Sequence, residues 1–365
     1  MIQVENHTPF PVMAFEKHGR LGYIFDVIAF RMTFRLKNGY YADLADEQAA
    51  LITADEYYGE PETSSLKSET DLVVYKRNTD IHVIGSASAL GGSGTQWMAG
   101  IRVGDFSKRL MLSGPRCWRY ENHRWRLGQA ESVDSVPLRY ELAYGGVWST
   151  GDGPEDKQTF SANPSGCGYY PTIQHLDITQ EYRAPQLTRF SQDDENNSHH
   201  IDTICTPQGT GPMSRWWQNR LQYAGTYDDH WRENCRPFFP NDFSELFYNS
   251  AHPELIYPAH LSGNEPIVLE GLLPESSRVV TGLPGYQPVC VLTDINNHLH
   301  TRLPVADTLT INLDERLIYL TWRLTVPVAL QMQEAVLGCL VPAPDERSLS
   351  WQINILQMVK VHSSL

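Results

Sequence analysis

The feature that most constrains the fold is a succession of short strand-like segments separated by turn residues. The first, residues 23–36 (YIFDVIAFRMTFRL), is dense in aromatic and β-branched residues and ends at Asn38-Gly39, a strong hairpin signal. No alternation of strands with long helices appears, so a parallel-sheet enzyme fold is disfavoured. The pattern predicts a mainly β protein with antiparallel sandwich-like or barrel-like lobes. Further strands are expected at residues 71–75, 81–89, 96–103, 109–112, 267–273, 289–292, 298–302, 308–313 and 316–324.

The middle of the chain breaks this pattern. Residues 145–211 are rich in Gly, Pro, Asn, Ser and Asp, which is typical of a long irregular segment. Residues 214–234 carry apolar side chains at helical spacing and predict one or two short helices, and another is expected within residues 43–58. The chain therefore divides into a β-rich lobe, a connecting region and a second β-rich lobe, with one continuous unit as the alternative. The expected boundaries are residues 1–190, 191–265 and 266–365.

Charge and targeting signals narrow the class of protein. The formal net charge of −14 disfavours nucleic acid as a partner, and the one stretch that mixes Arg with aromatics, residues 116–126, is expected to be a strand pair. The N-terminus has no signal-peptide pattern, and no apolar run approaches the roughly 20 residues that span a bilayer. Six dispersed cysteines form no CxxC pair. We expect a cytoplasmic protein without membrane insertion.

Two places could carry chemistry, although neither completes a catalytic arrangement. Cys167 lies between two glycines, which would leave its thiol accessible, but no histidine can be assigned as its base. A cluster of zinc-type ligands has a spacing that matches no recognised site. We therefore expect neither catalysis nor a cofactor. A hydrolase or toxin that uses Cys167 or the His199/His200 cluster remains the alternative. That cluster comprises His199, His200, Asp202 and Cys205.

Aromatic side chains are concentrated directly after the irregular middle. A surface that holds a protein partner needs aromatic anchors ringed by polar groups, and this region has that composition. Aromatic residues of this kind also serve as core, so the region either forms a partner surface or supports one. The candidate partner-binding residues are Trp216, Trp217, Tyr223, Tyr227, Asp228 and Trp231.

Several longer motifs resemble, in their order and spacing, a bacterial family known mainly as a domain of unknown function. Its members are accessory proteins of the type VI secretion system. The resemblance runs from near Thr79 to about Arg323, and residues 327–365 do not match it. The motifs are residues 136–146 (VPLRYELAYGG), Asn163-Pro164-x-Gly166-x-Gly168, residues 223–231 (YAGTYDDHW), Pro240-x-Asp242-Phe243, Leu261-x-Gly263-x-Glu265 and residues 320–323 (LTWR).

The resemblance implies a function in protein secretion. Relatives are thought to act as cytoplasmic adaptors or chaperones that bind a toxic effector, often through its PAAR domain or its N-terminal region. They then help to load that effector onto the VgrG spike and need no cofactor. A structural component of the secretion apparatus is a further alternative.

Overall fold

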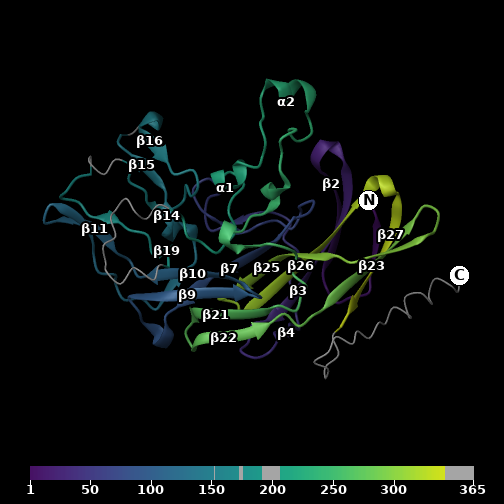
Figure 1. Ribbon diagram of the computed structural model, residues 1–365, viewed down its shortest axis with the longest axis horizontal. Coiled ribbons are helices and arrows are strands. Elements are labelled where there is room, and N and C mark those ends of the chain that lie inside the picture. Colours follow the sequence, from purple (N-terminus) through teal and green to yellow (C-terminus); the bar gives the residue numbers. More distant parts are fainter. Residues whose placement is uncertain (152, 172–175, 191–205, 342–365) are drawn as a thin grey trace.

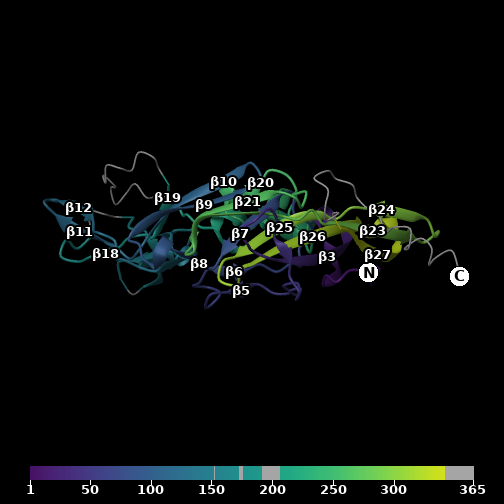
Figure 2. The ribbon, with the colours of Figure 1, turned by 90° about the horizontal axis from the view of Figure 1, so that it is seen from below.

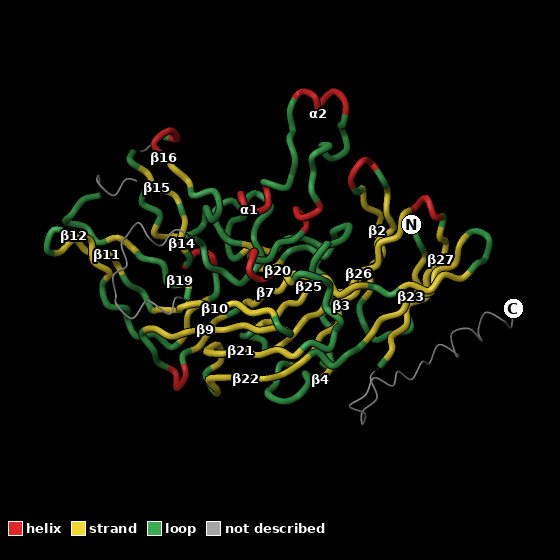
Figure 3. Tube along the Cα trace, viewed as in Figure 1, coloured by secondary structure: helices red, strands yellow, loops and turns green. Residues whose placement is uncertain are grey.

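The computed structural model describes residues 1–151, 153–171, 176–190 and 206–341. Figures 1 and 2 show a flattened, elongated molecule whose body is made of strands. The helices are all short, and Figure 3 shows them in red as single turns between the strands. These observations confirm the prediction of a mainly β fold. Among the described residues the sheets are open, and none closes into a barrel.

The largest sheet has seven strands and occupies the centre of the molecule. Six follow one another in the order β2-β3-β26-β25-β7-β20, and β4 pairs with β3. Its strands are β2 (Val12–His18), β3 (Ile24–Arg35), β4 (Asp43–Leu44), β7 (Thr79–Ile84), β20 (Ile256–Tyr257), β25 (Val305–Asn312) and β26 (Leu317–Pro327). The strands expected at residues 308–313 and 316–324 are confirmed as β25 and β26, which pair antiparallel on either side of Asp314-Glu315.

A five-stranded and a four-stranded sheet make up most of the remaining body. The five-stranded sheet has the order β19-β10-β9-β21-β22, and the four-stranded sheet has the order β1-β27-β23-β24. The bounds are β19 (Leu187–Arg189), β10 (Phe106–Ser113), β9 (Gln96–Val103), β21 (Pro266–Leu273), β22 (Ser276–Gly282), β1 (Gln3–Asn6), β27 (Met332–Leu340), β23 (Gln287–Asp294) and β24 (Leu299–Arg302).

Smaller strand groups lie around these sheets. The basic stretch at residues 116–126 forms a hairpin, as expected, within the sheet β12-β11-β18. Four two-stranded pairs, β13–β8, β14–β17, β15–β16 and β5–β6, complete the strands. Their bounds are β12 (Arg124–Leu127), β11 (Cys117–Glu121), β18 (Tyr182–Arg183), β13 (Ser135–Pro137), β8 (Ser86–Ser88), β14 (Tyr144–Gly145), β17 (Cys167–Gly168), β15 (Val147–Ser149), β16 (Lys157–Thr159), β5 (Glu56–Tyr57) and β6 (Leu66–Ser68).

Strands from the two ends of the chain share sheets. β3 pairs with β26, β9 pairs with β21, and β7 runs parallel to β25. Strands from residues 1–190 and 266–365 therefore pair with one another in both the seven-stranded and the five-stranded sheet. Among the described strands, the other parallel pairs are β1–β27 and β14–β17, and the remaining pairs are antiparallel.

The two large sheets enclose one hydrophobic core. Alternate residues of β3, such as Phe30 and Met32, point to the same face as Leu320 and Trp322 of β26, because side chains two apart share a face. The rings of Phe30 and Trp322 stack with their centroids 6.4 Å apart. The same buried cluster includes Ala99, Ile101, Val103, Leu110, Leu112, Ile267 and Leu269 of the five-stranded sheet.

Two expected elements are wrong. Residues 43–58 contain no helix, because their polar groups pair with a strand. The Gln48 side chain accepts from the Thr33 backbone N–H at 2.9 Å and donates to its carbonyl at 3.1 Å. Residues 71–75 form no strand, because side chains take up their carbonyls: Arg323 donates to those of Asp71 and Val73.

The short helices expected within residues 214–234 are confirmed as α1 (Gln218–Leu221) and α2 (Asp229–Asn234). Figure 1 shows α2 at the tip of a loop that rises above the body of the molecule. Within the described residues, no helix has both the length and the apolar character that a membrane crossing requires.

Candidate functional site

The two neighbouring tryptophans of the aromatic region have opposite environments. Trp217 is only 3% exposed and packs edge-on against Tyr140, with ring centroids 5.0 Å apart. Trp216 is 62% exposed. Trp217 therefore belongs to the core and fixes the start of α1, whereas Trp216 stands free at the surface. Of this pair, only Trp216 is positioned to meet a partner.

A projecting segment, residues 223–243, carries the other candidate residues. Its base is closed by Asp242, whose carboxylate accepts from the backbone N–H of Thr226 at 2.9 Å and from its hydroxyl at 2.7 Å. Gly225 has a φ of +81°, and a Cβ there would lie 3.0 Å from the backbone nitrogen of Phe243. Only glycine meets both requirements at low cost. The ends of the segment are therefore held together, and its tip is presented in one arrangement.

The tip of the projecting segment is the short helix α2. Asp228 precedes it and accepts a hydrogen bond from the backbone N–H of Trp231 at 2.9 Å, as an N-cap does. The Trp231 indole nitrogen donates to the carbonyl of Phe238 at 2.8 Å, and its ring lies 4.7 Å from that of Tyr227. A six-residue helix is not stable alone, so the cap and the indole anchor hold it in place. Asp228 and Trp231 thus support the tip, while Tyr227 is half exposed on it.

The hairpin between β2 and β3 supports the projecting segment from the side. The Arg20 guanidinium donates to the carbonyl of Asn241 at 2.8 Å. The ring of Phe238 lies 6.0 Å from that of His18, and it approaches Gly22 so closely that a Cβ there would meet it at 3.0 Å. Segments more than 200 residues apart in sequence therefore form one surface.

The combined surface exposes large apolar side chains on both segments. Tyr223 is partly exposed at the base of the projecting segment, close in sequence to exposed Leu221 of α1. We call this set the aromatic surface: Trp216, Leu221, Tyr227 and Phe238 from the α1–α2 region, with Tyr23 and Ile24 from the hairpin. Large apolar side chains that stay exposed are a feature of interaction sites.

The opposite face of the seven-stranded sheet is polar and covered. Residues that alternate with the core positions, such as Arg31 and Thr33 of β3 or Thr321 and Arg323 of β26, point away from the apolar core. They are nevertheless buried, because residues 46–76 lie over them. Strand alternation alone would predict that these charged groups face solvent.

Ion pairs neutralise the charges on this covered face. Arg323 Nε lies 2.6 Å from Asp307, Arg31 lies 2.7 Å from Asp71, and Lys76 lies 2.7 Å from Asp80. Each of these six residues is at least nine-tenths buried. A buried charge is tolerated when it has a partner of opposite charge, and each of these six residues has one. We call this set the covered ion network.

Glu69 joins the covered ion network to the base of the projecting segment. Its carboxylate lies 2.7 Å from the Arg220 guanidinium of α1 and 3.2 Å from Lys76 Nζ. Burial acts to raise the pKa of Glu69, but Arg220 and Lys76 hold it well below its usual value. Arg220 also donates to the carbonyls of Phe247 and Met213. The position of α1 is therefore fixed by buried electrostatics.

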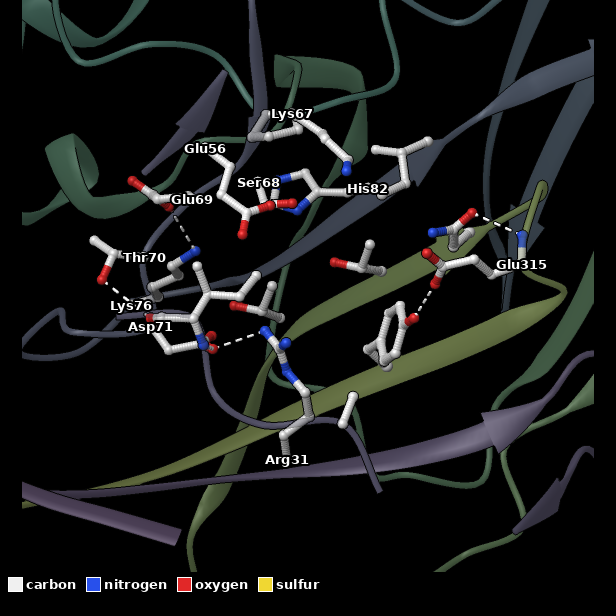
Figure 4. Close-up of a pocket in the computed structure, with 18 of the residues that line it drawn as sticks. Arg31, Glu56, Lys67, Ser68, Glu69, Thr70, Asp71, Lys76, His82 and Glu315 are labelled. Carbon is white, nitrogen blue, oxygen red and sulfur yellow. Dashed lines mark hydrogen bonds and ion pairs between the residues drawn. The ribbon is translucent and has the colours of Figure 1, made fainter. Parts of the chain in front are cut away.

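A polar cavity of about 170 Å³ lies between this face and its cover. Figure 4 shows Glu56, Lys67 and His82 on one side, Arg31 opposite them and Glu315 towards one end. Composition and motif spacing gave no indication of this cavity. The one signal was the regular alternation of charged with aromatic residues in FRMTFR and LTWRL, which is ordinarily typical of a solvated face.

Of the residues considered for catalysis, the structure describes only Cys167. Cys167 lies on β17 beside β14, where burial raises the pKa of its thiol to about 11, so the reactive thiolate is scarce near neutral pH. The cluster of His199, His200, Asp202 and Cys205 lies outside the described residues. In the part of the chain that the structure describes, no group of three or more His, Cys, Asp or Glu is arranged to hold a metal ion.

The fold and these surfaces define a mainly β protein of several open sheets, with a covered ion network and an exposed aromatic surface. The chain belongs to the family described as "Uncharacterized protein conserved in bacteria (DUF2169)", whose model matches residues 25–323. Membership of a family of unknown function is thus confirmed, and the match begins earlier than the motifs indicated. No curated protein and no solved structure matches the chain.

Proposed function

We propose that this protein is a cytoplasmic adaptor or chaperone that binds a type VI secretion effector and promotes its loading onto the VgrG spike. The observation that carries the proposal is the aromatic surface, on which large apolar side chains stay exposed on a braced projecting segment. Leaving such side chains in water forgoes the free energy of burial, which a bound partner would recover. Its contact on the effector would be a PAAR domain or the N-terminal region.

The way the surface is built suits protein binding. Affinity in protein interfaces comes mainly from a few aromatic anchors surrounded by polar groups. Tyr227 and Trp216 are such anchors, and the Arg232–Asp229 ion pair of α2 supplies polar groups beside Tyr227. Because Asp242 and Trp231 already fix the projecting segment, little conformational entropy remains to be lost on binding.

The sequence motifs support the proposed type of partner. The residues YAGTYDDHW (223–231) and Pro240-x-Asp242-Phe243, which resemble the secretion accessory family, make up most of the projecting segment. The projecting segment therefore contains both the motifs that resemble the secretion accessory family and exposed aromatic side chains. This coincidence supports a role in which the projecting segment contacts the effector.

A pull-down of the tagged protein from a native lysate, at two salt concentrations and with mass spectrometry, tests the proposal. Recovery of a PAAR-containing effector or a VgrG protein is the expected result. The double variant Trp216→Ala/Tyr227→Ala should weaken recovery about tenfold or more. Leu303→Ala, which removes a similarly exposed side chain from a different loop, should not.

Two other outcomes would overturn the proposal. If the protein elutes without any secretion component, the adaptor function fails. If light scattering instead shows large assemblies of this chain alone, a structural component of the apparatus becomes the better explanation.

A further inference from the structure

The cavity on the covered face contains a buried histidine with an unused nitrogen. His82 of β7 lines the cavity and is only 3% exposed. Its Nε2 lies 3.2 Å from the Ser250 hydroxyl. Its Nδ1 makes no hydrogen bond with any residue that the structure describes. This nitrogen is not sealed off by packed side chains but faces the cavity, where water or a ligand can meet it.

The neighbours of His82 determine which kind of group its Nδ1 can meet. The Ser250 hydroxyl donates to the Asp80 carboxylate at 3.3 Å, so its oxygen is left to accept the Nε2–H of His82. Nδ1 therefore carries a lone pair. Burial lowers the pKa of His82 to about 4, which keeps the ring neutral near pH 7. The nitrogen is consequently a hydrogen-bond acceptor that calls for a donor.

The unpaired charges of the cavity wall are mainly negative. Three of its cations, Arg31, Lys76 and Arg323, already have buried carboxylate partners. The Glu56 carboxylate has no partner among the described residues, and Glu315 accepts only from the Tyr319 hydroxyl. Lys67 is the one cation of the wall without an ion-pair partner in the described chain, and it is exposed, as Glu56 and Glu315 are.

We propose that this cavity binds an organic cation with a guanidinium group, which donates to Glu56, Glu315 and His82 Nδ1. Its volume of about 170 Å³ is below that of pockets for drug-sized ligands, so the ligand is small or is the end of a side chain. A free small molecule and a basic side chain of a bound protein share this chemistry. The proposal does not depend on the adaptor function.

Titration calorimetry with methylguanidinium and with the peptide Gly-Arg-Gly tests this site. Saturable binding with one site per chain is the expected result for at least one probe. Glu56→Gln and Glu315→Gln should each weaken binding about tenfold, because each removes one charge-assisted hydrogen bond. Lys67→Met should strengthen it, since a competing cation is removed from the rim. The unfolding midpoint of each variant checks that the fold is retained.

A second readout locates the bound cation. The ¹⁵N chemical shift of His82 Nδ1 should change on saturation, because a lone pair becomes a hydrogen-bond acceptor. Tighter binding of the peptide points to a partner's side chain, and equal or tighter binding of methylguanidinium points to a free metabolite-sized cation. Absence of saturable binding by both probes, or binding of acetate in their place, overturns the proposal.

Discussion

The covered ion network and the projecting segment use their functional groups in opposite ways. In the network, Arg323 and Asp307 are withdrawn from water and paired at 2.6 Å. On the projecting segment, Tyr227 remains half exposed although it lies on a fixed support. The network thus buries paired charges that hold the fold together. The projecting segment exposes apolar side chains that the fold does not need for its own stability. Changes in the network should affect folding, and changes in the aromatic surface should affect binding.

The largest effect is expected from removing one partner of the covered ion network. Arg323→Leu leaves Asp307 buried without a counter-ion and should lower the free energy of unfolding by about 3–5 kcal/mol. Urea denaturation measures this loss. Arg316→Leu is the matched control, because the Arg316–Glu275 pair is exposed and should contribute no more than about 1 kcal/mol. Equal losses in both variants would refute the distinction.

The burial of His82 on the covered face should make the stability of the protein depend on pH. The folded-state pKa of His82, about 4, lies below the ordinary value of 6.5, so the unfolded chain binds more protons between these values. Stability should therefore fall as the pH drops from 6.5 to 4, by about 3 kcal/mol for this group. His252, whose pKa burial also lowers to about 4, acts in the same direction.

Denaturation at several pH values measures this dependence. His82→Gln should flatten part of the slope. An unchanged slope in His82→Gln would mean that this histidine is not held neutral by burial.

A smaller effect is expected at the tip of the projecting segment. Asp228→Ala removes the N-cap of α2 and should cost about 1 kcal/mol of local stability. Hydrogen exchange at the amides of Trp231 and its neighbours should accelerate about fivefold, while exchange in β26 stays the same. Acceleration throughout the sheet would show that the segment is coupled to the body more strongly than its contacts indicate.

The smallest effect on stability is expected from the aromatic surface itself. Trp216→Ala should change the free energy of unfolding by no more than about 0.5 kcal/mol, since its side chain is largely in water. Trp217→Ala, one residue away, should cost about 3–5 kcal/mol because it empties a core position. Similar losses in the two variants would contradict the contrast between these positions.

The sequence predicted the strands better than it predicted their environment. The strand at residues 96–103 was expected with the bounds that β9 has, because its flanking turns are clear. The sequence could not predict that Trp216 is exposed and Trp217 buried. The helix that follows them has only four residues, which is too short for its apolar spacing to define a buried face. Arg31 and Arg323 alternate with apolar residues as solvent-facing positions do. Their burial depends on residues 46–76, which are distant in sequence from β26 and follow no regular pattern.

Hydrogen exchange of the protein alone and in complex with the recovered effector tests the central claim most directly. We expect slower exchange on binding in residues 223–243 and in the β2–β3 hairpin around Arg20–Gly22, with no change in β25 or β26. Protection confined to other surfaces, or none at all despite a stable complex, would contradict the claim that the aromatic surface holds the partner.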